Sequence, residues 1–179
     1  MVKGTALINM VEYVEKKKGI YGLEILHKEI NKENLIIPQL KNINKSDEFS
    51  VRYFERMLNA SLKSLGSSEE TIHDFGYSYG TENGLGFSSR MLKLESFKKV
   101  LDYITASMQK NMPLFKVRSE DLSETTYVLK ISNLSSKEQR IFVSGYLDSL
   151  ISNISKKIQK KEEDHKGEKV VTLRFLQNI

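Results

Sequence analysis

Apolar residues recur at helical spacing through the first two thirds of the chain. In residues 5–17 they fall at i, i+3, i+4 and i+7, which predicts a helix with one buried stripe that ends at Gly19. The same spacing predicts a second helix, which includes residues 23–30 and stops before Pro38. A third helix is predicted over residues 51–65.

Serines and acids mark the start of a fourth helix. Ser67-Ser68-Glu69-Glu70 fits the S-x-x-E capping box, in which a serine oxygen and a glutamate carboxylate accept hydrogen bonds from amides at the helix start. This helix runs toward the glycine-rich segment 80–86, which we interpret as a helix end or bend. A fifth helix is predicted over residues 95–109. Its apolar face comprises Phe97, Val100, Leu101, Ile104 and Met108.

The last third of the chain changes from helical spacing to alternation. Residues 127–131 alternate in polarity, and residues 170–175 are β-branched or aromatic at most positions, so both predict strands. Residues 114–118 are a third candidate strand. These strands follow the predicted helices, which favours an α+β fold with helices first and an antiparallel sheet near the end.

A long helix is predicted between the first two of these strands. Ser135-Ser136-Lys137-Glu138 is a second candidate capping box, and apolar residues at helical spacing continue to Ile158, so this helix is expected to be the longest. The mixed charges of residues 156–169 predict the charged end of that helix and a solvent-facing loop.

Length and composition limit the number of domains and the kinds of site that the chain can form. The 179 residues favour a single domain, with a helical part over about 1–90 and a sheet-containing part over about 91–179. The absence of cysteine excludes disulfides, thiolate metal sites and iron–sulfur clusters. No apolar run is long enough to cross a bilayer, and we expect a cytoplasmic protein. The net charge of +5 arises from mixed signs and alone does not indicate nucleic-acid binding.

Three short motifs resemble those of bacterial haem-nitric oxide/oxygen-binding (H-NOX) domains. The motifs are the opening Val2-Lys3-Gly4-Thr5 before a helix, the segment 70–76 with sequence ETIHDFG, and Pro113-Leu114-Phe115 at the entry to the sheet. The resemblance extends over nearly the whole chain. It implies an H-NOX-like fold.

The haem contacts of that family are not retained in this chain. Family members carry a histidine on the helix before the proline, whereas the similar run here places Lys98 at that position. Their Tyr-x-Ser-x-Arg motif for the haem propionates corresponds to Asn133-x-Ser135-x-Lys137, in which only the serine is unchanged. Because iron needs an axial ligand and Met108 is a weak one, we expect no haem cofactor.

The pattern is closer to haem-free relatives of H-NOX, and more distantly to 4-vinyl reductase domains and transport-particle subunits. This resemblance implies a non-catalytic sensory or adaptor domain that binds a protein partner and has a small apolar or acyl molecule as a candidate ligand. Tyr77, Tyr79 and Phe87, beside the glycines, are the candidate lining or docking residues; core packing is the competing interpretation. No local motif pairs a serine with a histidine, so we do not expect an enzyme.

Two alternative functions remain open from the sequence. The first is haem binding through an unorthodox ligand such as His73. The second is binding to nucleic acid, which is not expected, or to another anionic surface through clustered lysines. These lysines are Lys16, Lys17, Lys18, Lys156, Lys157, Lys160 and Lys161.

Overall fold

A computed structural model describes residues 1–32, 42–83, 96–153 and 158–176. The helices are α1 (Gly4–Asn31), α2 (Val51–Leu65), α3 (Glu69–Asn83), α5 (Phe97–Asn111) and α6 (Lys137–Ser152). The strands are β1 (Val2–Lys3), β2 (Glu48–Phe49), β3 (Lys116–Ser123), β4 (Thr126–Ser132), β5 (Ile158–His165) and β6 (Glu168–Phe175). Helices precede the main sheet along the chain, so the predicted α+β fold class is confirmed.

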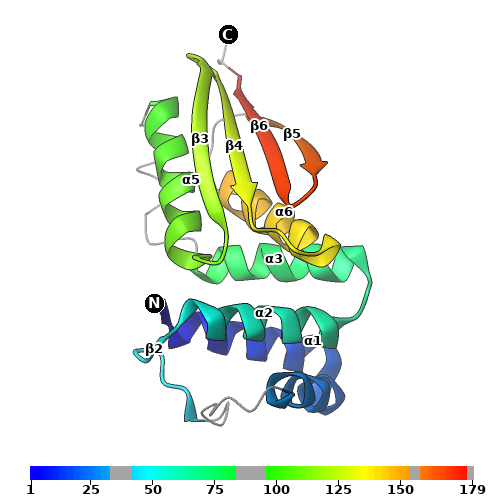
Figure 1. Cartoon of the computed structure of the whole chain (residues 1–179). Helices are drawn as coiled ribbons and strands as arrows, with labels where there is room; N and C mark the ends of the chain where they lie inside the picture. Colours follow the sequence, from blue (N-terminus) through cyan, green and yellow to red (C-terminus); the bar gives the residue numbers. More distant parts are fainter. Residues whose placement is uncertain (33–41, 84–95, 154–157, 177–179) are drawn as a thin grey trace.

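The elements form layers (Figure 1). Helices α1 and α2 pack against each other, and α3 crosses between this pair and the part of the molecule that holds the four-stranded sheet. Helix α6 packs along α3, and α5 lies beside β3. The small β1–β2 pair ties the N-terminus to the start of α2, a contact that two-residue strands give no pattern to predict.

The main sheet is antiparallel, with strand order β3-β4-β6-β5. Its core face continues across the strands, because Leu129 on β4 pairs with Val171 on β6, which in turn pairs with Glu162 on β5. Leu129 and Val171 are fully buried. The apolar face of the sheet therefore ends in a charged residue at its β5 edge.

Helix boundaries follow the glycines and serines of the sequence. Gly19 has φ +61° and interrupts α1, so the two helices predicted on either side of it are confirmed. Gly66, with φ +88°, ends α2 as predicted. In both predicted capping boxes the serine that caps the helix lies one residue later than predicted, because Ser68 accepts from the Thr71 amide and Ser136 accepts from the Gln139 amide.

The predicted long helix before Ile158 is wrong. Helix α6 ends at Ser152, and α1 is the longest helical element among the described residues. Residues 158–165, predicted as the end of that helix and a loop, form strand β5, which joins β6 through a turn at Gly167. The third candidate strand, residues 114–118, begins later than predicted and extends to Ser123 as β3.

Helices α3 and α6 approach closely through glycines. A Cβ atom built on Gly76 of α3 would lie 2.0 Å from the carbonyl oxygen of Phe142 on α6. A Cβ atom on Gly145 of α6 would lie 2.0 Å from the carbonyl oxygen of His73 on α3. The two backbones thus touch where side chains would separate them, and α3 is fixed against α6.

In the described residues, no helix has the length and apolarity that crossing a bilayer requires.

Candidate functional site

An aromatic cluster joins α3, α6 and α2, and is here defined as Phe54, Phe75, Tyr79, Phe142 and Tyr146. All five side chains are essentially excluded from solvent. The Tyr79 ring lies 5.6 Å from the Phe142 ring and 6.1 Å from the Tyr146 ring, in the tilted arrangements that aromatic pairs prefer. The predicted site residue Tyr79 is therefore part of the core.

Two tyrosine hydroxyls connect this aromatic cluster to α5. The Tyr79 hydroxyl donates to the carbonyl oxygen of Asn111 at 3.0 Å. The Tyr146 hydroxyl lies 3.1 Å from Ser107 Oγ and accepts from Asn111 Nδ2 at 3.3 Å. Burial raises the pKa of both tyrosines, so the hydroxyls stay protonated. Side chains of α3 and α6 therefore reach α5 directly.

The positions that the family resemblance assigns to haem contacts have other partners here. Lys98 on α5 is two-thirds exposed, and its Nζ lies 3.7 Å from Asp121 on β3. The neighbouring Phe97 ring packs on Phe175 of β6, with 4.8 Å between centroids. Ser135 donates its hydroxyl to Gln139 Oε1 at 3.1 Å, and both Ser135 and Lys98 are exposed to solvent.

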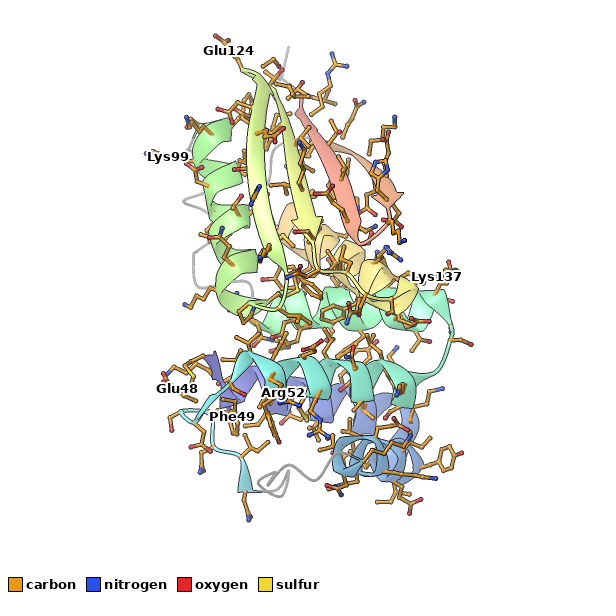
Figure 2. All side chains as sticks on the ribbon, viewed as in Figure 1. Glu48, Phe49, Arg52, Lys99, Glu124 and Lys137 are labelled. Carbon is orange, nitrogen blue, oxygen red and sulfur yellow. The ribbon has the colours of Figure 1, made fainter. Side chains whose placement is uncertain are left out.

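The two remaining positions of that motif, Asn133 and Lys137, also form contacts at the surface. Lys137 forms an ion pair with Glu69 at the start of α3. Figure 2 shows Lys137 at the edge of the molecule, beyond the end of the sheet. The Nδ2 of Asn133 donates to the carbonyl oxygen of Leu114 at 3.4 Å. These residues link the segments before and within α6 to their neighbours.

Tyr77 and Tyr79 do not lie together. Tyr77 is 40% exposed and its hydroxyl lies 2.9 Å from Ser152 Oγ, whereas Tyr79 is buried. Residues two positions apart on a helix point about 200° away from each other, so Tyr77 and Tyr79 cannot face the same space. Phe87, the third candidate, lies outside the described residues.

Tyr77 belongs to an α1–α3 groove of about 330 Å³, which is open to solvent. The groove is lined by Tyr13, Lys16, Lys17, Asp74, Tyr77, Ser78, Thr81 and Glu82. Burial, and then the nearby Asp74 carboxylate, raise the pKa of Tyr13 to about 12. The Tyr13 hydroxyl has no hydrogen-bond partner among the described residues. The groove thus combines both signs of charge with two aromatic rings.

An ionic network connects α6, β5 and β6, and comprises Ser144, Asp148, Lys160, Glu162 and Lys169. Lys160 Nζ lies 2.5 Å from Asp148 Oδ1 and 2.7 Å from Glu162 Oε1. Lys169 Nζ, which is almost fully buried, lies 2.7 Å from Glu162 Oε2. Ser144 donates to the same carboxylate. Burial would raise the pKa of Glu162, but the hydrogen bonds from Lys160 and Lys169 outweigh it, and the pKa is lowered.

The ionic network divides the lysines that the sequence grouped as one basic surface. Lys160 is largely buried in the network, and Lys161 pairs with Glu163 at 2.7 Å on the outer face of β5. Lys156 and Lys157 lie outside the described residues. Among the described lysines of that predicted surface, Lys161 and the three before Gly19 are therefore the exposed ones.

The three histidines lie apart from one another, on α1, on α3 and at the end of β5. Nε2 of His73 lies 2.9 Å from Asp148 Oδ2, at the border of the ionic network. His27 and His165 are exposed on α1 and at the end of β5. Across the described ranges, His, Asp and Glu side chains form no group of three or more that could hold a metal ion.

Replacing Glu162 with glutamine should lower the free energy of unfolding at neutral pH by about 1–3 kcal/mol, because Lys169 loses a charged partner. The folded-state pKa of Glu162 lies below 4.5, so its contribution is present above the unfolded pKa and is lost as pH falls through the folded value. Urea unfolding at several pH values measures this, and wild type and variant should converge in acid. Glu163→Gln, on the outer face, should change stability much less. An offset that is unchanged in acid would contradict the prediction.

Comparisons with known proteins identify the fold of this chain. No family model matches the chain, and no curated protein matches it. Among solved structures, the Fe(II) unliganded H-NOX protein from K. algicida aligns over 99% of this chain and 98% of its own, with TM-score 0.64 and 14% identity. An Fe(II) H-NOX protein from S. oneidensis aligns over 99% and 98%, with TM-score 0.60 and 12% identity.

An oxygen-binding H-NOX domain related to soluble guanylate cyclases is similar to this chain to a comparable extent. It aligns over 98% of this chain and 96% of its own, with TM-score 0.58 and 10% identity. Likenesses at such low identity show the fold alone. The chain has an H-NOX-like fold, as its sequence motifs predict.

Proposed function

We propose that this chain is a non-catalytic sensory or adaptor domain that has lost the haem of the H-NOX fold and acts by binding a protein partner. The observation that carries the proposal is the aromatic cluster. Tyr79 and Tyr146 extend from α3 and α6 to α5, and their hydroxyls are hydrogen-bonded to α5 residues. The volume between these helices is occupied by the protein's own side chains.

The described residues do not fit a haem. An iron ion needs an axial ligand from the protein, and the resemblance assigns that role to the position of Lys98, whose ammonium group faces solvent and Asp121. His73 on α3 is hydrogen-bonded to Asp148 on the α6 side. Lys137, at the propionate-contact position, is paired with Glu69. Each candidate contact therefore has another structural role.

Catalysis has no supporting geometry in the described part of the chain. A histidine–carboxylate pair activates a nucleophile only when a hydroxyl or thiol lies against the histidine. The His73–Asp148 pair is instead connected to Lys160, which lies 2.5 Å from Asp148. This arrangement supports a role for His73 in holding α3 to α6.

The α1–α3 groove is the surface that we assign to the protein partner. Lys16, Asp74 and Glu82 offer both signs of charge along it, and Tyr77 offers an exposed ring. Tyrosine is enriched where proteins recognise each other, because its ring buries apolar area while its hydroxyl stays hydrogen-bonded. A polar peptide segment with one apolar anchor fits this surface.

Native mass spectrometry of the tagged chain, purified gently from haem-supplemented cells of its own source, tests the proposal. We expect the mass of the apoprotein, no Soret absorption, and a second polypeptide bound to the chain. An apoglobin prepared in parallel controls for haem supply. Stoichiometric haem would refute the haem-free part of the proposal.

The same experiment with two variants tests the groove. Tyr77→Asp should remove the second polypeptide, because a charge replaces the exposed ring at the proposed contact. Leu122→Asp is the matched control, since Leu122 is also exposed but lies on β3, and it should retain the polypeptide. Equal retention by both variants would show that the partner binds elsewhere.

A further inference from the structure

The interruption of α1 places two large apolar side chains in solvent beside a run of lysines. Residues 16–21, here called the α1 corner, read KKKGIY. Ile20 is 74% exposed and Tyr21 is 68% exposed. Among the described residues, these are the only two large exposed apolar side chains that are adjacent in sequence. The corner thus combines apolar and cationic groups within six residues.

The backbone explains why these side chains face outward. Gly19 has φ +61°, so α1 turns sharply at this residue. Gly22 is buried in the turn, where an added Cβ would lie 2.4 Å from Lys18 Cβ and 3.1 Å from Val14 Cγ1. Leu26 continues the buried face of the second half. Ile20 and Tyr21 are therefore left outside the fold.

We propose that the α1 corner is a contact site for anionic lipid surfaces. Ile20 and Tyr21 enter the headgroup region of the bilayer, while Lys16 and Lys18 face lipid phosphates. Lys17 has a different role, since it lies 3.7 Å from Asp74 and 5.6 Å from the Tyr13 ring centroid. Lys16 also lines the α1–α3 groove, so the two sites share this residue, whereas Lys18, Ile20 and Tyr21 belong to the α1 corner alone.

Charge complementarity favours an anionic surface. Residues 15–28 contain four lysines and two glutamates, Glu15 and Glu24, so the turn carries a net positive charge. Lysines near an anionic membrane gain electrostatic attraction that falls off within a Debye length. Figure 1 shows the second half of α1 on the side of the helical layer that faces away from the four-stranded sheet, so the sheet does not obstruct a planar surface there.

The apolar pair favours lipid over nucleic acid. Tyrosine is enriched at the membrane–water interface, where its ring and hydroxyl meet apolar and wet surroundings respectively. Ile20 has no flat face on which a base could stack, yet it gains free energy when its side chain leaves water. A side chain that protrudes from the surface can insert into a bilayer without a matching pocket, because the lipids rearrange around it. Nucleic acid would use the lysines and leave Ile20 in water.

Sedimentation with vesicles tests the site. The full chain should bind phosphatidylcholine vesicles that contain phosphatidylserine, bind pure phosphatidylcholine vesicles far less, and dissociate as salt is raised. Lys16→Gln with Lys18→Gln should weaken binding about twenty-five-fold, at roughly a five-fold loss for each lysine. Ile20→Ser with Tyr21→Ser should weaken it at least about ten-fold. Circular dichroism should show all variants folded.

Matched controls use exposed residues elsewhere on the chain. Lys110→Gln with Lys116→Gln removes the same charge, and Leu122→Ser removes an exposed apolar side chain; neither should change vesicle binding. Because the chain has no tryptophan, Tyr21→Trp adds a single reporter whose emission should shift to the blue on vesicles, whereas that of Tyr77→Trp should not. Undiminished binding after the corner substitutions, or tighter binding to duplex DNA than to vesicles, would overturn the proposal.

Discussion

Replacing Gly76 with alanine should lower the free energy of unfolding by about 3 kcal/mol, although alanine is the better helix former. On a solvent-exposed helix surface, replacing glycine with alanine raises the free energy of unfolding by about 1 kcal/mol. Here the new methyl group would lie 2.0 Å from the Phe142 carbonyl oxygen and 2.8 Å from its carbon, which are backbone atoms that no rotamer change can move. The helices α3 and α6 must separate, so packing outweighs propensity.

Urea denaturation of three variants measures this effect. Gly145→Ala should cost a similar amount, because its methyl group meets the His73 carbonyl oxygen from the other side. The double variant should cost less than the sum, since helices already parted by one methyl group accommodate the second. Ser78→Ala, on the same helix, should change stability by about 0.5 kcal/mol or less. A gain in stability for Gly76→Ala would mean that α3 and α6 are farther apart in solution.

Local sequence rules predicted the helices well, because their signals lie within one element. Gly66 adopts a positive φ at the end of α2, and Gly19 does so where α1 is interrupted. Such signals need no knowledge of distant residues. The exact caps of α3 and α6 were misplaced by one position, since adjacent serines in both sequences offer equivalent oxygens.

Strand β5 was missed because two of its inward positions, after Ile158, are charged. Lys160 and Glu162 alternate with outward residues as a strand requires, but the usual signal is apolar alternation. Their burial depends on Asp148 of α6 and Lys169 of β6, and no local pattern reveals these partners. Inward-facing charges on an edge strand also hinder pairing with a further chain, so the pattern has a physical rationale.

The candidate site illustrates the same limit. The sequence grouped Tyr77 with Tyr79 because both flank the glycines, and helical geometry alone separates them. That Tyr79 reaches Asn111, 32 residues away, depends on how α3 lies against α5. The α1 corner was visible as three lysines before a glycine, but the exposure of Ile20 required the turn itself.

Replacing Tyr79 with alanine should lower the free energy of unfolding by about 3–5 kcal/mol, because the side chain is 1% exposed and its removal leaves a cavity among aromatic rings. Tyr79→Phe separates the two contributions. It keeps the ring and removes only the hydrogen bond to Asn111, so it should cost about 1 kcal/mol. Urea unfolding of both variants measures the difference, and similar losses for the two would mean that the ring contributes little.

The cavity of Tyr79→Ala offers a direct test of whether the wild-type interior is full. A small apolar molecule such as indole should raise the melting temperature of Tyr79→Ala, because a ligand that binds only the folded state stabilises it. Wild-type protein and Tyr79→Phe should show no such rise, since their rings occupy the space. If indole stabilised all three proteins equally, the wild-type interior would already hold an open cavity. The Tyr79 side chain would then not be what fills the space that a bound haem would need.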